Sequence, residues 1–287
     1  MIHNKRYRLE LRTYCADSII GYESEWRVVQ EMSAFFLKDQ VIVVTGAAGG
    51  IGRDICEDLS EAGAKIVLAG RNADTLKETA DSLKIADSLI VSTDITKPES
   101  VKSLLDATLA KFNRIDGLVN NAGGGSSMKK PEETPYEEWV RMIDFNLTGT
   151  FNCCIEFGKH MISQKYGKIV NISSVAGTKG NPFMLHYSAA KAGVISLTNN
   201  LSFMWAEHNI CVNTVVPGLI ATPNMIKWGA VPDSTDENND PVPRLTLPPA
   251  PSDVAGLCRY LLSPAADMIT GETIPVRSWF RSDRFWN

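Results

Sequence analysis

Two side chains with the chemistry of proton transfer, Tyr187 and Lys191, stand four positions apart in the sequence. At that spacing they share one face of a helix, so the lysine ammonium group lies near the phenol. A nearby positive charge favours the phenolate and lowers the tyrosine pKa from its reference value of about 10. The pair is therefore suited to exchanging a proton with a substrate oxygen, because such transfer is most efficient when the donor pKa approaches the working pH.

The same spacing is common on ordinary helices, so its meaning depends on the neighbouring residues. A predicted strand ends at Asn171–Ser174, shortly before Tyr187. A serine hydroxyl at this strand end is suited to donating a hydrogen bond to a substrate oxygen. Ser173 and Ser174 both remain candidates at this point, because neighbouring side chains on a strand point to opposite faces of the sheet.

A glycine-rich turn follows the first predicted strand, at Thr45–Gly52. Gly46, Gly50 and Gly52 allow the backbone to turn tightly and to approach a pyrophosphate group. The helix that begins there offers free N–H groups and a partial positive charge. This turn therefore predicts a site for a dinucleotide cofactor.

The end of the second predicted strand indicates which dinucleotide is expected. An acidic residue there binds the ribose 2′-hydroxyl group, whereas an arginine accommodates a 2′-phosphate. In this sequence Gly70 takes the place of the acid, and Arg71 follows it. Because a guanidinium group pairs with phosphate in a bidentate manner, we expect NADP(H) to be preferred, with NAD(H) as the alternative.

Short β-branched runs alternate with longer helical stretches from Gln40 onward, which is typical of βαβ units and a parallel sheet. The predicted strands are 41–45, 65–69, 89–93, 117–120, 168–172, 211–216 and 273–276. The predicted helices are 51–61, 74–82, 100–112, 136–164, 187–207 and 252–262. The expected fold class is α/β, with one doubly wound domain whose seven-stranded, mainly parallel sheet is flanked by helices. Right-handed crossovers then place ligands at the carboxyl ends of the strands.

The composition excludes several classes of protein. The chain has 287 residues, is 44% hydrophobic and has a formal net charge of -4, which argues against binding nucleic acid. No apolar run reaches the length that spans a bilayer. The 6 cysteines show neither a C-x-x-C pair nor zinc-ligand spacing, so we expect buried thiols in the reducing cytoplasm and no metal site.

Two segments differ from the βαβ pattern. Residues 1–36 lack a clean period and precede the domain expected at 37–287; we predict a disordered arm or a non-native start, with Met32 as a natural initiator. The segment at about 221–251 is rich in proline and carries several acidic residues. A connection of this length is typically a functional lid or disordered, and we expect a substrate lid.

The motifs together resemble those of the short-chain dehydrogenase/reductase family. In chain order they are T-G-A-A-G-G-I-G at Thr45–Gly52, N-N-A-G at Asn120–Gly123, I-S-S at Ile172–Ser174, Y-S-A-A-K at Tyr187–Lys191 and P-G-L-I-A-T at Pro217–Thr222. They follow the family's order and approximate spacing over about 37–276. The resemblance implies a Rossmann fold and an NAD(P)(H)-dependent oxidoreductase that interconverts an alcohol and a carbonyl by hydride transfer.

The resemblance also implies a role for each matched residue. Tyr187 would be the general acid/base, and Lys191 would lower its pKa and bind the nicotinamide ribose. Ser174, rather than Ser173, would polarise the substrate oxygen, and Asn146 would hold a water in the proton relay. The implied cofactor contacts are Gly46, Gly50, Ile51, Gly52, Arg71, Asp94, Asn120, Ala122, Gly123, Tyr187, Lys191, Pro217, Gly218, Ile220 and Thr222.

Within that set, individual contacts have distinct implied partners. Asp94 would contact adenine. Asn120 would chiefly stabilise the sheet while bordering the cofactor. Ile220 and Thr222 would hold the nicotinamide carboxamide group.

Two departures from the family pattern bear on the cofactor and on assembly. Gly49 stands where NADP-dependent members commonly carry a basic residue, so Arg71 alone supports the phosphate. The last strand continues as Ile274–Trp279 instead of ending in a D-G-G turn. That end commonly lies at a subunit interface in tetrameric members of the family, so we expect assembly to differ from theirs. The expected state is a homo-oligomer, either a dimer or a homotetramer.

Three functions remain to be distinguished. The leading one is an alcohol dehydrogenase or ketone reductase acting on a small molecule. The second is a reductase of 3-oxoacyl or enoyl thioesters, whose acyl chain would suit Met225, Ile226 and Trp228 in the lid. The third is a non-catalytic dinucleotide-binding protein, against which the complete set of Ser174, Tyr187 and Lys191 argues.

Overall fold

The computed structural model describes residues 35–85, 87–125, 128–236 and 238–278. Contacts between residues divide the chain into Met1–Phe36 and a larger unit, Leu37–Asn287, and the larger unit contains all the elements below. The expectation for residues 1–36 falls almost wholly outside the described residues, as does the chain after residue 278.

The described residues form a seven-stranded parallel sheet in the order β3-β2-β1-β4-β5-β6-β7. The strands are β1 (Val41–Thr45), β2 (Lys65–Gly70), β3 (Ser88–Ser92), β4 (Gly117–Asn120), β5 (Gly167–Ile172), β6 (Ile210–Pro217) and β7 (Thr273–Val276). Each predicted strand is confirmed to within one residue at either end, and the predicted α/β class is confirmed. The strand order reverses between β1 and β4, which is where a doubly wound sheet opens a crevice for ligands.

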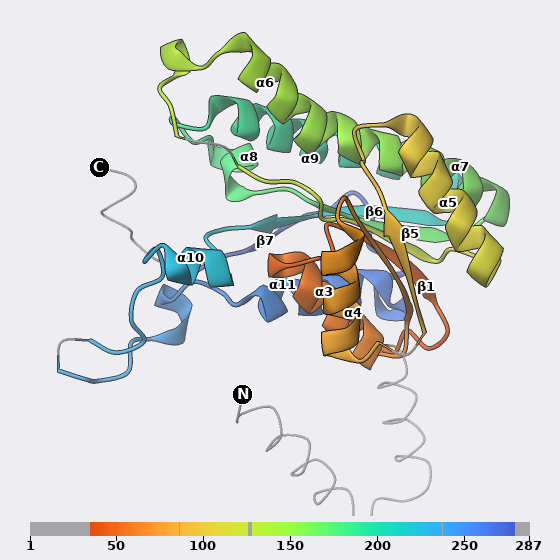
Figure 1. Ribbon diagram of the computed structural model, residues 1–287, viewed down its shortest axis with the longest axis horizontal. Coiled ribbons are helices and arrows are strands. Elements are labelled where there is room, and N and C mark those ends of the chain that lie inside the picture. The colour runs from red at the N-terminus through yellow and green to blue at the C-terminus, as the bar shows by residue number, and fades with distance from the viewer. Residues whose placement is uncertain (1–34, 86, 126–127, 237, 279–287) are drawn as a thin grey trace, which may run out of the picture. The chain divides into compact units, whose positions relative to one another are not determined.

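Helices cover both faces of the sheet (Figure 1). The helices α3 (Gly50–Glu61), α4 (Ala73–Leu83) and α11 (Pro251–Leu262) lie on one face. The helices α5 (Pro98–Phe112), α7 (Gly149–Gln164) and α9 (Leu185–Trp205) lie on the other. Shorter helices α6 (Tyr136–Ile143), α8 (Val175–Lys179) and α10 (Pro223–Lys227) follow β4, β5 and β6 respectively.

Strand β1 shows why the sheet is buried on both sides. All five of its residues are buried. Val41 and Val43 belong to the core beneath α5, α7 and α9, whereas Ile42 and Val44 belong to the core beneath α3 and α11. Successive side chains on a strand point to opposite faces, so an uninterrupted apolar run is what a strand between two helical layers requires.

The predicted helix 136–164 is divided in the structure. A π-helical segment, Asp144–Thr148, separates α6 from α7 and contains Asn146. Single π-helical turns inside α-helices are frequent at functional sites. The short helices α8 and α10 were not predicted, and α10 lies within the segment expected to be the lid.

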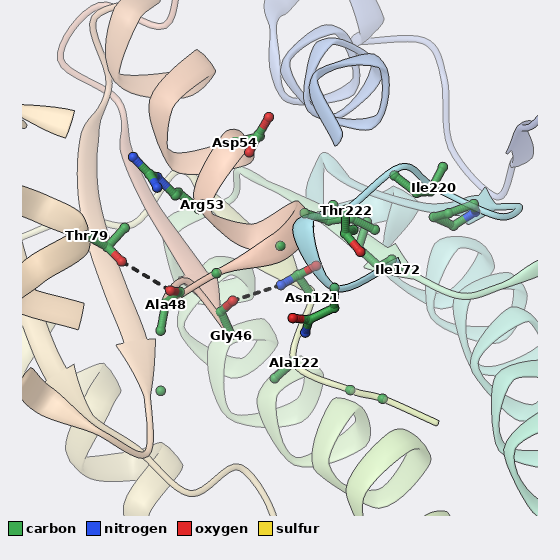
Figure 2. A pocket seen from close by; sticks show the side chains of 18 of the residues that line it. Gly46, Ala48, Arg53, Asp54, Thr79, Asn121, Ala122, Ile172, Ile220 and Thr222 are labelled. Atoms are coloured by element: carbon green, nitrogen blue, oxygen red, sulfur yellow. Dashed lines mark hydrogen bonds between the residues drawn. The ribbon is translucent and has the colours of Figure 1, made fainter. Parts of the chain in front are cut away.

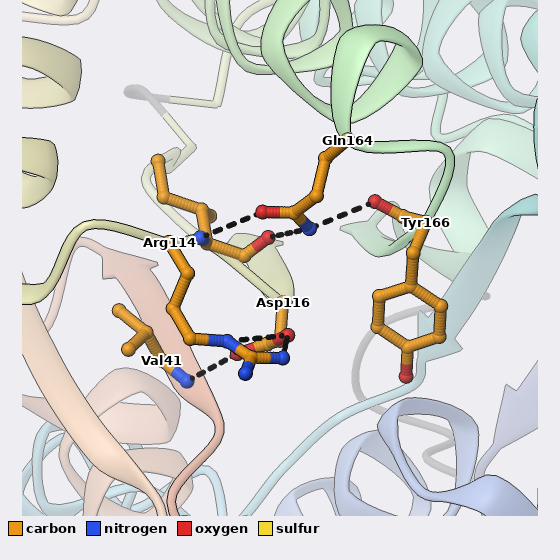
Figure 3. Close-up of polar contacts among 6 residues, drawn as sticks. Val41, Arg114, Asp116, Gln164 and Tyr166 are labelled. Atoms are coloured by element: carbon orange, nitrogen blue, oxygen red, sulfur yellow. Dashed lines mark hydrogen bonds and ion pairs between the residues drawn. The ribbon is translucent and has the colours of Figure 1, made fainter.

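A polar cluster joins β1 and β4 at the amino-terminal edge of the sheet (Figure 3). The buried carboxylate of Asp116 accepts hydrogen bonds from the Val41 backbone N–H at 2.8 Å and from the guanidinium group of Arg114. The side-chain amide of Gln164 donates to the carbonyl of Ile115 at 2.8 Å. These contacts hold together the edge of the sheet opposite the ligand crevice, so we infer that this cluster stabilises the fold.

Candidate active site

A groove of about 1180 Å³ runs along the carboxyl ends of the central strands. Each of six strands is followed directly by a residue that lines this groove. These residues are Gly46 after β1, Arg71 after β2, Thr93 after β3, Asn121 after β4, Ser173 after β5 and Gly218 after β6. The groove therefore occupies the crevice that the strand order predicts.

The glycine-rich turn forms one wall of the groove (Figure 2). Gly46 has a φ of +66°, and a Cβ atom there would lie 2.9 Å from the Cα atom of Ala122. Gly50 has a φ of +54° and begins α3, whose N-cap Gly49 offers no side-chain hydrogen bond. The first N–H groups of α3 are thus not capped by a side chain, as a helix that receives a phosphate requires.

The geometry of this wall fits a dinucleotide pyrophosphate. Asn121 donates hydrogen bonds of 3.1 Å to the carbonyls of Thr45 and Gly46, which holds the turn in place (Figure 2). At Gly52 a Cβ atom would lie 2.1 Å from the Gly46 carbonyl oxygen. Gly52 therefore serves the close packing of α3 on the turn, and it does not itself line the groove.

Most of the predicted cofactor contacts do line the groove. They are Gly46, Gly50, Ile51, Arg71, Asp94, Ala122, Gly123, Tyr187, Lys191, Pro217, Gly218, Ile220 and Thr222. Asn120 does not line the groove: it is buried and donates to the side-chain oxygen of Asn171 at 2.8 Å, which agrees with its implied role in stabilising the sheet, and its contact with the cofactor stays a prediction. The neighbouring Asn121 does line the groove.

Helix α9 carries the predicted proton-transfer pair. Tyr187 lies in its first turn, where the ring is half-buried in the wall of the groove. The Nζ atom of Lys191 is buried 5.8 Å from the centre of that ring and donates a hydrogen bond of 2.9 Å to the Ile172 carbonyl. A Cβ atom at Gly123 would lie 2.9 Å from this Nζ atom, so Gly123 leaves room for the ammonium group.

The end of β5 separates the roles of its two serines. The hydroxyl of Ser173 is buried and donates to the backbone carbonyl of Lys191 at 2.8 Å. The hydroxyl of Ser174 caps α8 by accepting from the Ala176 N–H at 3.2 Å, and it lies close enough to the Tyr187 phenol to lower its pKa. Both serines line the groove, and Ser174 is the one that interacts with the phenol.

Burial governs the titration of the pair. Burial raises the pKa of Tyr187, and the hydrogen bond with Ser174 opposes that rise. Burial also lowers the pKa of Lys191 to about 8, so its ammonium form still predominates at neutral pH. The raised pKa of Tyr187 keeps the phenol protonated at neutral pH, and the predicted lowering of this pKa by Lys191 stays a prediction.

Asn146 does not line the groove but holds the chain that does. Its buried side chain accepts from the N–H of Gly124 at 2.9 Å and donates to the carbonyl of the same residue at 3.0 Å. It also donates to the Met142 carbonyl within the π-helical segment, at 3.2 Å. These contacts fix the chain after β4; the predicted role in a water relay stays a prediction.

The end of the groove near β2 carries several polar side chains. The guanidinium carbon of Arg71 lies 5.5 Å from the centre of the Phe145 ring. Arg53, which follows the glycine-rich turn, also lines this end and donates to the Ser82 hydroxyl at 3.4 Å. Hydrogen bonds from Thr96 hold the pKa of Asp94 below its usual range, so Asp94 is ionised at neutral pH.

The groove residues missed by sequence reasoning include Arg53, Asn121 and Phe145. Asn121 stands inside a motif that was recognised, so its amide was available as a signal. Arg53 and Phe145 each adjoin a recognised residue, but which side of a helix they occupy depends on how that helix packs.

The chain matches the family of short chain dehydrogenases over residues 40–231. It is 38% identical over 245 residues to an acetoacetyl-CoA reductase of Acinetobacter sp. (strain RA3849), covering 83% of this chain and 96% of that protein. It is 39% identical over 249 residues to a 3-oxoacyl-[acyl-carrier-protein] reductase of Synechocystis sp. (strain ATCC 27184 / PCC 6803 / Kazusa), covering 84% and 96%. A solved NAD+-bound xylitol dehydrogenase superposes with a TM-score of 0.77 at 27% identity, covering 84% and 99%.

The fold and the groove thus define a nicotinamide-dependent oxidoreductase, and the chain belongs to the short-chain dehydrogenase family. It acts on CH–OH or C=O groups with NAD(P)(H). Within the described residues, no helix has the length and apolar character needed to cross a membrane. The same residues contain no cluster of side chains suited to binding a metal ion.

Proposed function

We propose that Ser174, Tyr187 and Lys191 carry out the proton transfer of an alcohol–carbonyl interconversion on a small molecule. The observation that supports this most directly is that Ser174, Tyr187 and Lys191 line the same groove as the glycine-rich turn. A bound nicotinamide would supply or accept the hydride.

In the reducing direction, the Ser174 hydroxyl donates a hydrogen bond to the carbonyl oxygen, and Tyr187 gives that oxygen a proton. The buried Lys191 ammonium stabilises the phenolate left behind, because a positive charge favours the ionised form. In the oxidising direction the phenolate of Tyr187 removes the proton from the alcohol. The glycine-rich turn and Thr222 would bind the cofactor, and Asn146 positions the chain at Gly124.

The replacement Tyr187→Phe tests this assignment. We expect turnover to fall by about 10²- to 10⁴-fold, since the general acid/base is lost. Cofactor binding, measured by nicotinamide fluorescence, should survive because the groove keeps its other contacts. Wild-type turnover in this variant would overturn the assignment.

We further propose a preference for NADP(H) over NAD(H). Two guanidinium groups, those of Arg71 and Arg53, line the β2 end of the groove, where a 2′-phosphate would lie. Gly70 leaves the end of β2 without a carboxylate that would repel this phosphate. Acidic side chains further along the same wall, including Asp54, are the features that would favour NAD(H) instead.

The substrate is proposed at the level of a class. Both an alcohol or ketone and a 3-oxoacyl thioester suit the proton-transfer residues, and Met225 of the lid lines the groove as an apolar wall. The named relatives include two acyl-thioester reductases and one sugar-alcohol dehydrogenase. A panel of alcohols, ketones and 3-oxoacyl thioesters, followed at the nicotinamide absorbance band with both cofactors, would distinguish them.

We also propose that the protein is a homo-oligomer in the cytoplasm. Phe151 on α7 and Phe203 and Met204 on α9 are large apolar side chains exposed on the helical layer that covers one face of the sheet. Burying such side chains against a second copy is favourable. Light scattering should report a dimer or tetramer, and Phe203→Glu should shift the assembly toward a monomer.

The proposed cytoplasmic location rests on the cysteines. Those buried as free thiols, such as Cys56 and Cys258, suit a reducing compartment.

A further inference from the structure

Glu138 on α6 lies at the centre of a charged cluster beside α9, the helix that carries Tyr187 and Lys191. Its side chain is 11% exposed, and Oε2 lies 2.5 Å from the Nζ atom of Lys129. Its other carboxylate oxygen lies 3.5 Å from Nε2 of His186, which is buried and immediately precedes Tyr187. Arg141 lies at the edge of the cluster, 4.0 Å from the carboxylate.

Lys129 belongs to the chain that continues from the groove toward α6. Gly123 and Gly124, six and five residues before Lys129, line the groove. The Lys129 backbone N–H donates a hydrogen bond of 2.9 Å to the carbonyl of Phe183, just before α9. The chain after β4 and the chain before Tyr187 are therefore joined twice, once through the backbone and once through Glu138.

The carboxylate of Glu138 is well suited to hold such a junction. It is mostly withdrawn from solvent, so its interaction with Lys129 is screened less than that of a surface ion pair. Its two oxygens face different elements, Lys129 on one side and His186 on the other. The neighbouring Glu137 is exposed and serves as a matched acidic control on the same helix.

We infer that Glu138 is a positioning residue, which holds Lys129 against the start of α9 and so shapes the substrate side of the groove. This inference rests on the proposed function, because it assigns the chain next to Tyr187 to substrate binding. Glu138 does not touch the reacting atoms. Its loss should therefore weaken substrate binding more than it slows proton transfer.

Kinetics with Glu138→Gln test the inference on the full chain. We expect the KM of the best substrate found in the panel to rise by about 5- to 10-fold, while kcat changes by less than about twofold. Cofactor affinity and thermal unfolding should stay close to wild type. Glu137→Gln should behave as wild type throughout.

A second pair of variants guards against a folding defect in Glu138→Gln. Lys129→Met removes the partly exposed partner, and it should raise KM by a similar factor. The double variant Lys129→Met/Glu138→Gln should be no worse than either single variant, because both replacements remove one interaction. Additive effects of the two replacements would overturn the inference, as would a wild-type KM in Glu138→Gln.

Trypsin gives a test that needs no substrate. Cleavage after Lys129, identified by fragment mass, should be about fivefold faster in Glu138→Gln, because the side chain is released from its ion pair. Lys130 is followed by Pro131, which protects that bond from trypsin. An unchanged cleavage rate would overturn the inference.

The two proposals can fail separately. If the wild-type protein turned over no member of the panel, the proposed function would fail, and the cleavage rate would still decide the link between Glu138 and Lys129.

Discussion

The hydroxyl of Ser173 donates a hydrogen bond of 2.8 Å to the backbone carbonyl of Lys191. This contact joins the end of β5 to the second turn of α9. Because consecutive side chains at a strand end point in opposite directions, the same contact leaves the Ser174 hydroxyl facing Tyr187. Ser173 therefore anchors α9, and Ser174 is the serine that we propose takes part in the chemistry.

Replacing each serine in turn should separate these two roles. Ser174→Ala should lower kcat/KM by about 10²- to 10³-fold, since it removes a donor to the developing charge on oxygen, and as the N-cap of α8 it should also cost about 1 kcal/mol of unfolding free energy. Ser173→Ala should lower the free energy of unfolding by about 1 kcal/mol, the usual cost of a lost hydrogen bond, with a much smaller loss of kcat/KM. Steady-state kinetics and urea unfolding of both variants check this. The opposite pattern would exchange the two roles.

The pH dependence should reflect the raised pKa of Tyr187. Alcohol oxidation requires the phenolate, so its kcat/KM should rise with pH through the alkaline range. Carbonyl reduction requires the phenol, so its kcat/KM should be flat near neutrality and fall only at alkaline pH. Ser174 lowers this pKa, so the residual activity of Ser174→Ala should show both limbs displaced to higher pH. A displacement to lower pH would contradict the assigned hydrogen bond.

Lys191 should affect the pH dependence of the free energy of unfolding as well as activity. Its folded-state pKa of about 8 lies below the ordinary value of 10.5. Between those two values the unfolded chain holds a proton that the folded protein has released, so this group makes stability rise with pH across that window. Below pH 8 the group is protonated in both states and contributes no pH dependence. Urea unfolding of wild type and Lys191→Met should differ in slope from pH 8 to pH 10.5, and parallel profiles would argue against the shift.

Arg71 should control the choice of cofactor. Arg71→Ala should raise the KM for NADPH by about 10-fold or more, because a charge-assisted pair with the 2′-phosphate contributes roughly 1.5–3 kcal/mol. The KM for NADH should change little, since NADH carries no 2′-phosphate. Arg53→Ala, measured in the same way, shows whether the second guanidinium group shares the phosphate. Equal losses for both cofactors would speak against this role of Arg71.

Asp116 should matter for folding and not for catalysis. Asp116→Ala leaves the buried Val41 N–H without its acceptor, which should cost about 1–3 kcal/mol of unfolding free energy. Arg114→Gln should cost less than about 1 kcal/mol, because the guanidinium group is 58% exposed. Thermal unfolding gives the comparison. A kcat/KM reduced in Asp116→Ala at full folding would contradict the assignment of this cluster to stability.

The sequence by itself determined the strands, the main helices and the order in which groove residues follow them. Apolar runs and helical periods are local, so β1, the glycine-rich turn and the spacing of Tyr187 and Lys191 were predictable from neighbouring residues alone. The family resemblance then supplied the implied roles, including that of Ser174.

Only the tertiary structure decided how side chains from distant segments meet. It placed the Ser173 hydroxyl against the Lys191 carbonyl and the Asn120 amide against Asn171, whereas Asn121 lines the groove, because neighbouring side chains at the end of a strand point in opposite directions. It also joined Glu138 to Lys129 and His186 across different elements. Such contacts depend on the packing of one element against another, a long-range property that local periodicity does not encode.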